Sequence, residues 1–155
     1  MSRTGEITGE IIVKTAIGWL NTPYEDNAMA RCHGVDCAHL LLGVLIDAGL
    51  IGREEFHIPH YSNEWHLHRS EEKFVNNIEK VAEEVHGEPE LGDFLLFQYG
   101  RCISHGAIYS GKKRVIHAYV DLGVIESSLD DIIFYDRKGR FRLRKIYRFV
   151  GRRDA

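Results

Sequence analysis

The sequence predicts an α+β fold in which N-terminal helices pack against a C-terminal antiparallel sheet. In the first half of the chain, apolar residues recur at the spacing of one helical face. After Gly87 the pattern changes to short, β-rich segments separated by glycine-containing turns. With 155 residues, 44% of them hydrophobic and 28% charged, the chain is expected to form a single domain over residues 1–155.

The first helix is expected over residues 11–20, where apolar side chains mark one face. Thr8 is its candidate N-cap, and Glu10 is placed favourably in the first turn. Residues 21–23 end in Pro23, which cannot continue a helix, so a polar loop follows over residues 24–32.

Two further helices are expected before the sheet. Residues 36–48 are apolar on nearly every side, which predicts a buried helix, and Gly49 is a suitable residue to end it. Residues 52–69 are irregular and rich in histidine and aromatic residues, which indicates a structured surface loop. A third helix with one apolar face is expected from Ser70 to Val85.

The C-terminal half is expected to form a meander of five short strands joined by tight turns, with one short helix before the last strand. The strands are expected at residues 93–98, 103–109, 114–120, 124–127 and 143–150, and the short helix at residues 129–134.

Cys37 is predicted to lie in the first turn of the buried helix, with Asp36 as its N-cap. A helix N-terminus carries a partial positive charge and free N–H groups, which favour a thiolate and can stabilise an adjacent oxyanion. Cys37 is therefore a candidate nucleophile, and the alternative is a buried structural cysteine.

Two histidines are predicted to meet on the sheet. A hairpin centred on Gly111 would place His105 directly opposite His117, with Cβ atoms about 4.5–5.5 Å apart. A slip of one residue would put the rings on different faces. Two adjacent imidazoles can serve as a proton relay, in which one takes a proton and the other orients it. The alternative is two unrelated sheet histidines.

The charge pattern narrows the classes of partner. A net charge of −3 gives no case for nucleic acid. Basic residues cluster near the C-terminus, where we expect a solvated strand face and tail, with an anionic polymer such as the cell wall as the alternative. The members of this cluster are Arg137, Lys138, Arg140, Arg142, Arg144, Lys145, Arg148, Arg152 and Arg153.

Other features argue against membrane, disulfide and metal chemistry. Residues 1–10 lack a signal-peptide core and no segment has the length of a membrane span, so synthesis in the cytoplasm is expected. Three unevenly spaced cysteines do not form a disulfide framework. His57 with His60, and His66 with His68, form only loose pairs, so no metal site is expected.

Several motifs, taken in order, resemble the NlpC-type cysteine peptidases, a papain-like family of bacterial cell-wall hydrolases. The resemblance extends from about residue 17 to residue 149. The motifs are Thr22-Pro23-Tyr24, Gly34-Val35-Asp36-Cys37, Glu88-Pro89-Glu90-Leu91-Gly92-Asp93, Ser104-His105-Gly106-Ala107-Ile108-Tyr109 and Ile116-His117-Ala118.

The resemblance implies that Cys37 is the nucleophile, His105 the general base and acid, and His117 the residue that orients His105. It implies hydrolysis of an amide in peptidoglycan stem peptides, often between D-γ-glutamate and diaminopimelate or lysine, with no cofactor. The protein itself would act at the cell wall.

Four more residues are expected to contact the substrate or the oxyanion: Tyr24, Asp36, His39 and Ser104. His39 departs from the family, because many relatives have a small residue two positions after the cysteine. Its ring could narrow the pocket, face the core or donate a proton.

Residues 61–69 resemble the phage-tail and prophage branch of the family. Phage-tail proteins are therefore expected as possible partners. The alternative function is a non-hydrolytic assembly or cell-wall-binding component with the same fold.

Overall fold

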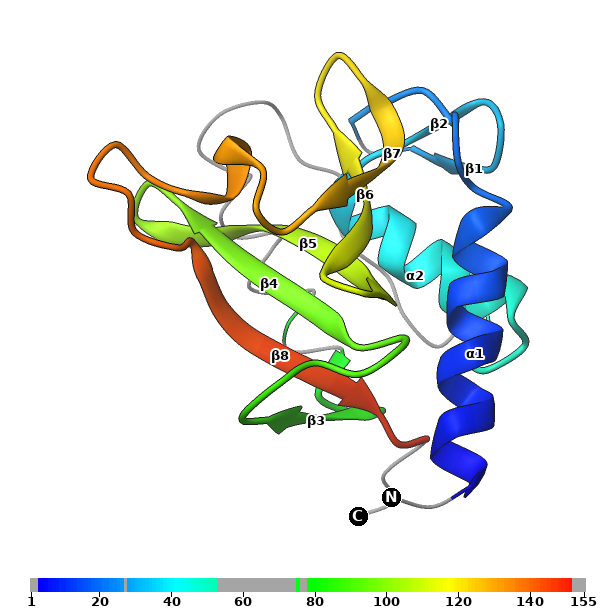
Figure 1. Ribbon diagram of the computed structural model, residues 1–155. Coiled ribbons are helices and arrows are strands. Elements are labelled where there is room, and N and C mark those ends of the chain that lie inside the picture. Colours follow the sequence, from blue (N-terminus) through cyan, green and yellow to red (C-terminus); the bar gives the residue numbers. More distant parts are fainter. Residues whose placement is uncertain (1–2, 27, 53–74, 76–77, 152–155) are drawn as a thin grey trace.

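The structure is a computed structural model that describes residues 3–26, 28–52, 75 and 78–151 (Figure 1). A six-stranded antiparallel sheet with the order β3-β8-β4-β5-β6-β7 forms its centre, and a two-stranded sheet pairs β1 with β2. The α+β prediction is therefore confirmed. The elements are α1 (Arg3–Ile17), β1 (Met29–Ala30), β2 (Gly34–Val35), α2 (Cys37–Asp47), β3 (Ala82–Val85), β4 (Phe94–Tyr99), β5 (Cys102–Gly111), β6 (Arg114–Tyr119), β7 (Gly123–Ser128), the 3₁₀ turn η1 (Ile132–Phe134) and β8 (Leu143–Phe149).

The five strands expected after Gly87 are confirmed as β4 to β8, with ends that differ by at most two residues. The short helix expected over residues 129–134 is only the 3₁₀ turn η1. The polar loop expected over residues 24–32 contains β1, which pairs with β2 directly before α2.

The helix α1 begins at Arg3, so Thr8 is not its N-cap and Glu10 is not in its first turn. Gly9 lies inside the helix, where it crosses the turn at Leu91 and Gly92. A Cβ atom on Gly9 would lie 2.3 Å from the carbonyl oxygen of Leu91. Glycine weakens an isolated helix, but here it allows a close tertiary contact, and that contact supports the helix across the predicted boundary.

The third helix does not reach Val85 as predicted. Val75 and Ile78 are helical, but Ala82–Val85 form strand β3, which pairs with β8 from Ala82↔Phe149 to Val85↔Ile146. The free edge of β8 offers backbone hydrogen bonds that override a helical pattern of apolar residues. The expected start of this helix at Ser70 and most of the loop at 52–69, with its four histidines, lie outside the described residues.

The core is divided by the sheet into two clusters. The larger one packs α1 and α2 against one face, where Leu40, Leu41 and Leu45 are fully buried. The smaller one covers the other face and includes Phe97, Ala107 and Phe134. Figure 1 shows α2 behind β5 and β6 and α1 at the side of the sheet. Neither helix, within the part of the chain described, has the length and apolar character needed to cross a membrane.

Candidate active site

Cys37 is the first residue of α2, as predicted, and its side chain is buried. Asp36 is the N-cap, with φ −103° and ψ 178°, and its Oδ1 accepts a hydrogen bond from the backbone N–H of His39 at 2.8 Å. Gly49 ends the helix with a φ of 75°, and the N–H of Leu50 bonds to the carbonyl of Leu45. The thiol of Cys37 is thereby held at the positive end of a well-capped helix.

The Cys37 thiol points at the end of strand β5. Its Sγ donates to the carbonyl oxygen of Ser104 at 3.7 Å. Ser104 lies in a β-bulge, because Phe97 pairs with His105 whereas Gln98 pairs with Ile103. A bulge redirects the backbone locally. Here it presents the Ser104 carbonyl to the Cys37 thiol, and His105 is the next residue in the chain.

The predicted register of the β5–β6 hairpin is wrong, although both histidines share a face. Lys112 and Lys113 form the two-residue turn with φ values of 53° and 59°, and Gly111 forms a bulge next to it. Ile108 therefore pairs with Ile116, a register that places Ala107, not His105, opposite His117. The shift is by two positions, and because side chains alternate with a period of two, it preserves the common face.

The two imidazoles are hydrogen-bonded to each other. His105 Nε2 and His117 Nδ1 are 2.8 Å apart, and the ring planes meet at 76°. His117 Nε2 lies 2.8 Å from the hydroxyl oxygen of Ser127 on β7. All three side chains are buried. Adjacent strands thus supply a continuous relay from His105 through His117 to Ser127.

Ser127 was missed by the sequence reasoning. It pairs with Val115, which lies two residues before His117 on β6, so the three share one face of the sheet. The turn at Leu122–Gly123 sets the register of β7 against β6, and this register could have identified Ser127 as a neighbour of His117.

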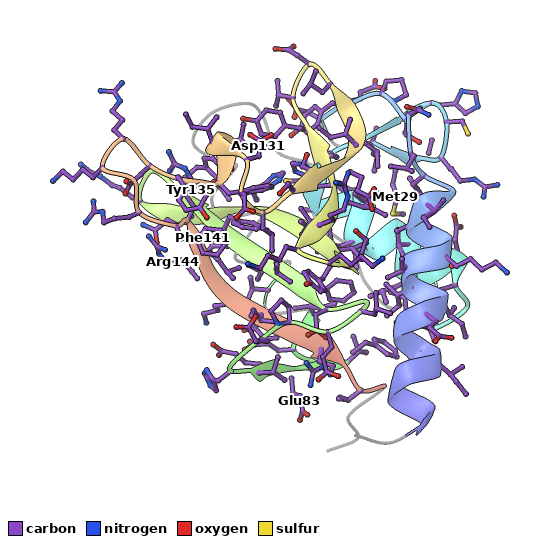
Figure 2. All side chains as sticks on the ribbon, in the orientation of Figure 1. Met29, Glu83, Asp131, Tyr135, Phe141 and Arg144 are labelled. Atoms are coloured by element: carbon purple, nitrogen blue, oxygen red, sulfur yellow. The ribbon has the colours of Figure 1, made fainter. Side chains whose placement is uncertain are left out.

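The interior position of the relay favours neutral imidazoles. Burial, and then the neighbouring His117, lower the pKa of His105 below its usual 6.5. Burial also lowers the pKa of His117, and the charge of Asp131 partly opposes that shift. Asp131 is the N-cap of η1, and Figure 2 shows it beside that turn. A neutral His105 is in the form required of a general base.

Aromatic rings enclose His105. The ring centroids of Phe97, Tyr99 and Tyr119 lie 6.0, 5.8 and 6.0 Å from that of His105. The Tyr99 hydroxyl donates to the carbonyl of Ile133 at 2.6 Å, and burial, followed by Tyr119, raises the pKa of Tyr99 to about 12. Tyr99 is therefore uncharged near neutral pH and lines one side of the site. These rings exclude water from His105, which strengthens electrostatic interactions there.

The remaining predicted residues lie around the N-terminus of α2. Tyr24 forms an isolated parallel bridge with Val35, which is two residues before Cys37. The Nδ1 of His39 lies 2.8 Å from Asp36 Oδ1, so the ring is joined to the cap. Ser104 contacts Cys37 through its backbone, and its hydroxyl donates to the Tyr99 carbonyl at 3.4 Å. Among the described residues, no group of three His, Cys, Asp or Glu could hold a metal ion.

Comparisons with known proteins agree with this architecture. The family model described as the NlpC/P60 family matches residues 21–142. No curated protein resembles the chain closely enough to count as a match. The NlpC/p60 domain of the peptidoglycan hydrolase SagA is 21% identical, covers 77% of this chain and 88% of its own, and superposes with a TM-score of 0.52.

Two further solved structures show the same fold. An NlpC/P60 family protein from Bacillus cereus is 16% identical with a TM-score of 0.64, and the match covers 92% of this chain but only 40% of that one. The P60 domain of an antigen from M. avium subspecies paratuberculosis is 14% identical with a TM-score of 0.60, covering 97% of this chain and 99% of that one. Because the family model spans most of the chain and includes Cys37, His105 and His117, the protein belongs to the NlpC/P60 family.

Proposed function

We propose that this protein is a cysteine peptidase or amidase that hydrolyses an amide bond in peptidoglycan stem peptides, of the D-γ-glutamyl-diaminopimelate or -lysine type. Family membership and a structural neighbour described as a peptidoglycan hydrolase support the substrate class. The observation that carries the proposal is the hydrogen bond between His105 and His117. His105 directly follows Ser104, whose carbonyl oxygen is in contact with the helix-tip thiol of Cys37.

The relay supplies the base. His105 Nε2 bonds to His117, which leaves Nδ1 as the nitrogen that takes the proton from the Cys37 thiol. If His117 donates a hydrogen bond from Nε2 to the Ser127 oxygen, its Nδ1 carries no proton. Nδ1 can then accept a hydrogen bond from the protonated Nε2 of His105. In this arrangement the imidazolium that forms on His105 is stabilised by a neutral partner, as the third residue does in other catalytic triads.

The chemical cycle is acyl transfer. The Cys37 thiolate attacks the amide carbonyl, and the backbone N–H groups at the start of α2 stabilise the negative charge on its oxygen. The carbon–nitrogen bond breaks, and His105 gives its proton to the leaving amine. A water molecule, deprotonated by His105, then attacks the thioester and releases the acid and the thiol.

Replacement of Cys37 by alanine tests this function directly. Cys37→Ala should abolish digestion of purified peptidoglycan, whereas Cys32→Ala, at an exposed cysteine, should leave it unchanged. Mass spectrometry of the released fragments identifies the bond that is cut. Digestion by Cys37→Ala at the wild-type rate would refute the assignment.

Alkylation separates this function from the alternative, a non-hydrolytic wall-binding or phage-tail component. Iodoacetamide near neutral pH should label the buried Cys37 faster than the exposed Cys32. A buried thiol can react faster than an exposed one only if it is activated as a thiolate. Slow labelling of Cys37, together with wall binding but no released fragments, would favour the non-hydrolytic component.

A further inference from the structure

Residues 135–144, here called the basic arm, form a hairpin that leads from η1 into β8. Tyr135 and Phe141 form a bridge across it, and Gly139, with a φ of 78°, completes the turn at its tip. Figure 1 shows this hairpin extending outward beside the turn between β4 and β5. It projects from the sheet face that carries the catalytic histidines.

Positive charge is concentrated on this arm. Residues 135–144 include five basic residues and one acidic residue, whereas the whole chain carries a net charge of −3. Arg137, Lys138, Arg140 and Arg144 are exposed to solvent. The opposite end of the sheet is acidic, with Glu83 and Glu84 exposed on β3. Figure 2 shows Arg144 beside Tyr135 and Phe141, with Glu83 well separated from them.

The one carboxylate of the arm is used to shape its tip. Asp136 Oδ1 accepts hydrogen bonds from the backbone N–H groups of Lys138 and Arg140 at 2.8 and 2.9 Å. Its Oδ2 accepts one from Arg140 Nε at 3.0 Å. The Arg144 side chain donates to the carbonyl oxygens of Phe141 and Leu143. The cations are therefore displayed on a preorganised loop, which lowers the entropy cost of binding an anion.

The base of the arm lies against the residues that enclose His105. The guanidinium of Arg142 lies 4.4 Å from the ring centroid of Tyr99, and the Phe141 ring lies 6.2 Å from that of Phe97. Both Tyr99 and Phe97 contact His105. A polymer bound along the arm would thus be held next to the catalytic centre.

We propose that the basic arm binds an anionic cell-wall polymer that carries repeating phosphodiester groups, and so holds the enzyme on its substrate. The location at the wall rests on the proposed function, but the binding chemistry does not. Three of the four exposed cations are arginines, whose planar fork matches phosphate oxygens in pairs. Single exposed ion pairs contribute little, so a ligand gains affinity here only if its repeated charges contact several of these cations at once. The net charge of −3 over the whole chain gives no case for nucleic acid as the ligand.

The test measures binding of the full chain to a labelled glycerol-phosphate polymer by fluorescence anisotropy at increasing salt. The double variant Arg137→Gln/Lys138→Gln leaves the Asp136–Arg140 ion pair intact, and the quadruple variant adds Arg140→Gln and Arg144→Gln. Affinity at low salt should fall at least about threefold in the double variant and tenfold in the quadruple variant. The matched control is Lys14→Gln/Arg31→Gln, at exposed cations off the arm, which should bind like wild type.

Turnover provides a separate readout. The quadruple variant should cleave a soluble stem peptide within about twofold of the wild-type rate but digest intact, polymer-bearing walls at least fivefold more slowly. Unchanged soluble-peptide cleavage also shows that the fold survives. Polymer binding is measured without turnover. The proposal for the arm can therefore be supported even if the peptidase assignment fails.

Three results would overturn the proposal. Wild-type affinity in the quadruple variant would show that the arm is not the binding surface. An equal loss in the Lys14/Arg31 control would indicate a general charge effect. Equally tight binding of duplex DNA or polyglutamate, at the same concentration of charge, would refute the assignment to a phosphodiester wall polymer.

Discussion

The proposed nucleophile and the histidine relay are assembled in opposite ways. Cys37, its N-cap Asp36 and the buried body of α2 come from one continuous segment. His105, His117 and Ser127 come from three strands that meet only when the sheet forms. The first part of the site depends on local helix geometry, whereas the second depends on strand register.

This difference means that only the relay depends on the register of the strands. A change of register by two positions would keep both histidines on one face, whereas a change by one position would put them on opposite faces. The bulges at Ser104 and Gly111 therefore matter for the relay, since they set how β4, β5 and β6 align.

The largest expected effect comes from removing His105, the proposed base that joins the two parts. His105→Gln should lower kcat/KM on peptidoglycan peptides at least about 10³-fold, or about 4 kcal/mol of transition-state stabilisation. His33→Gln, at an exposed histidine near β2, is the matched control and should retain activity. A loss below tenfold, in a variant that unfolds cooperatively, would exclude His105 as the base.

The contrast between local and assembled parts also explains what the sequence could predict. The start and end of α2 were predicted closely because an N-cap and a terminal glycine act within one turn of the helix. The common face of His105 and His117 was predicted, but their pairing was not, because the turn lies at Lys112–Lys113. The helix α1 and strand β3 were misjudged where contacts with Leu91 and β8, distant in sequence, override local preference. The aromatic residues around His105 come together through packing between strands. No local pattern in the sequence marks them as neighbours of His105.

Acid should destabilise the folded protein through the two histidines of the relay. In the folded state the pKa values of His105 and His117 lie below 6.5, their value in an unfolded chain. Below pH 6.5 the unfolded chain thus binds more protons than the folded one, so stability falls as pH falls, whereas above pH 6.5 it is unaffected by these groups. The slope should approach about 1.4 kcal/mol per pH unit for each histidine.

Urea unfolding between pH 7.5 and pH 5 measures this slope. The double variant His105→Gln/His117→Gln should show a clearly shallower dependence over the same range. An identical dependence in the wild type and the double variant would mean that the relay histidines do not bind protons more weakly in the folded state.

Loss of the outermost relay member should have a smaller effect on catalysis. Ser127→Ala leaves His117 Nε2 without its buried partner, so the proton arrangement that lets His117 accept from His105 is no longer favoured. We expect kcat to fall about 10- to 100-fold, with little change in KM, and the acidic limb of the pH–rate profile to shift. Ser127→Thr keeps the hydroxyl and should recover most of the activity.

The neighbouring Ser128 provides the matched control. Its hydroxyl accepts a bond from the backbone of Asp130 and takes no part in the relay, so Ser128→Ala should leave the pH–rate profile unchanged. A matching shift in both variants would assign the effect of Ser127→Ala to β7 as a whole, and not to the position of His117.

The smallest expected effect concerns the local part of the site. Asp36→Ala removes the acceptor for the N–H of His39, and this should lower the free energy of unfolding by about 1 kcal/mol. Asp36→Asn retains a capping oxygen and should cost only a few tenths of a kcal/mol. If Asp36 acts only as a cap, Asp36→Asn should also react with iodoacetamide at Cys37 as fast as the wild type. Slower alkylation at unchanged stability would show that the negative charge of Asp36, paired with His39, also shapes the environment of the thiol.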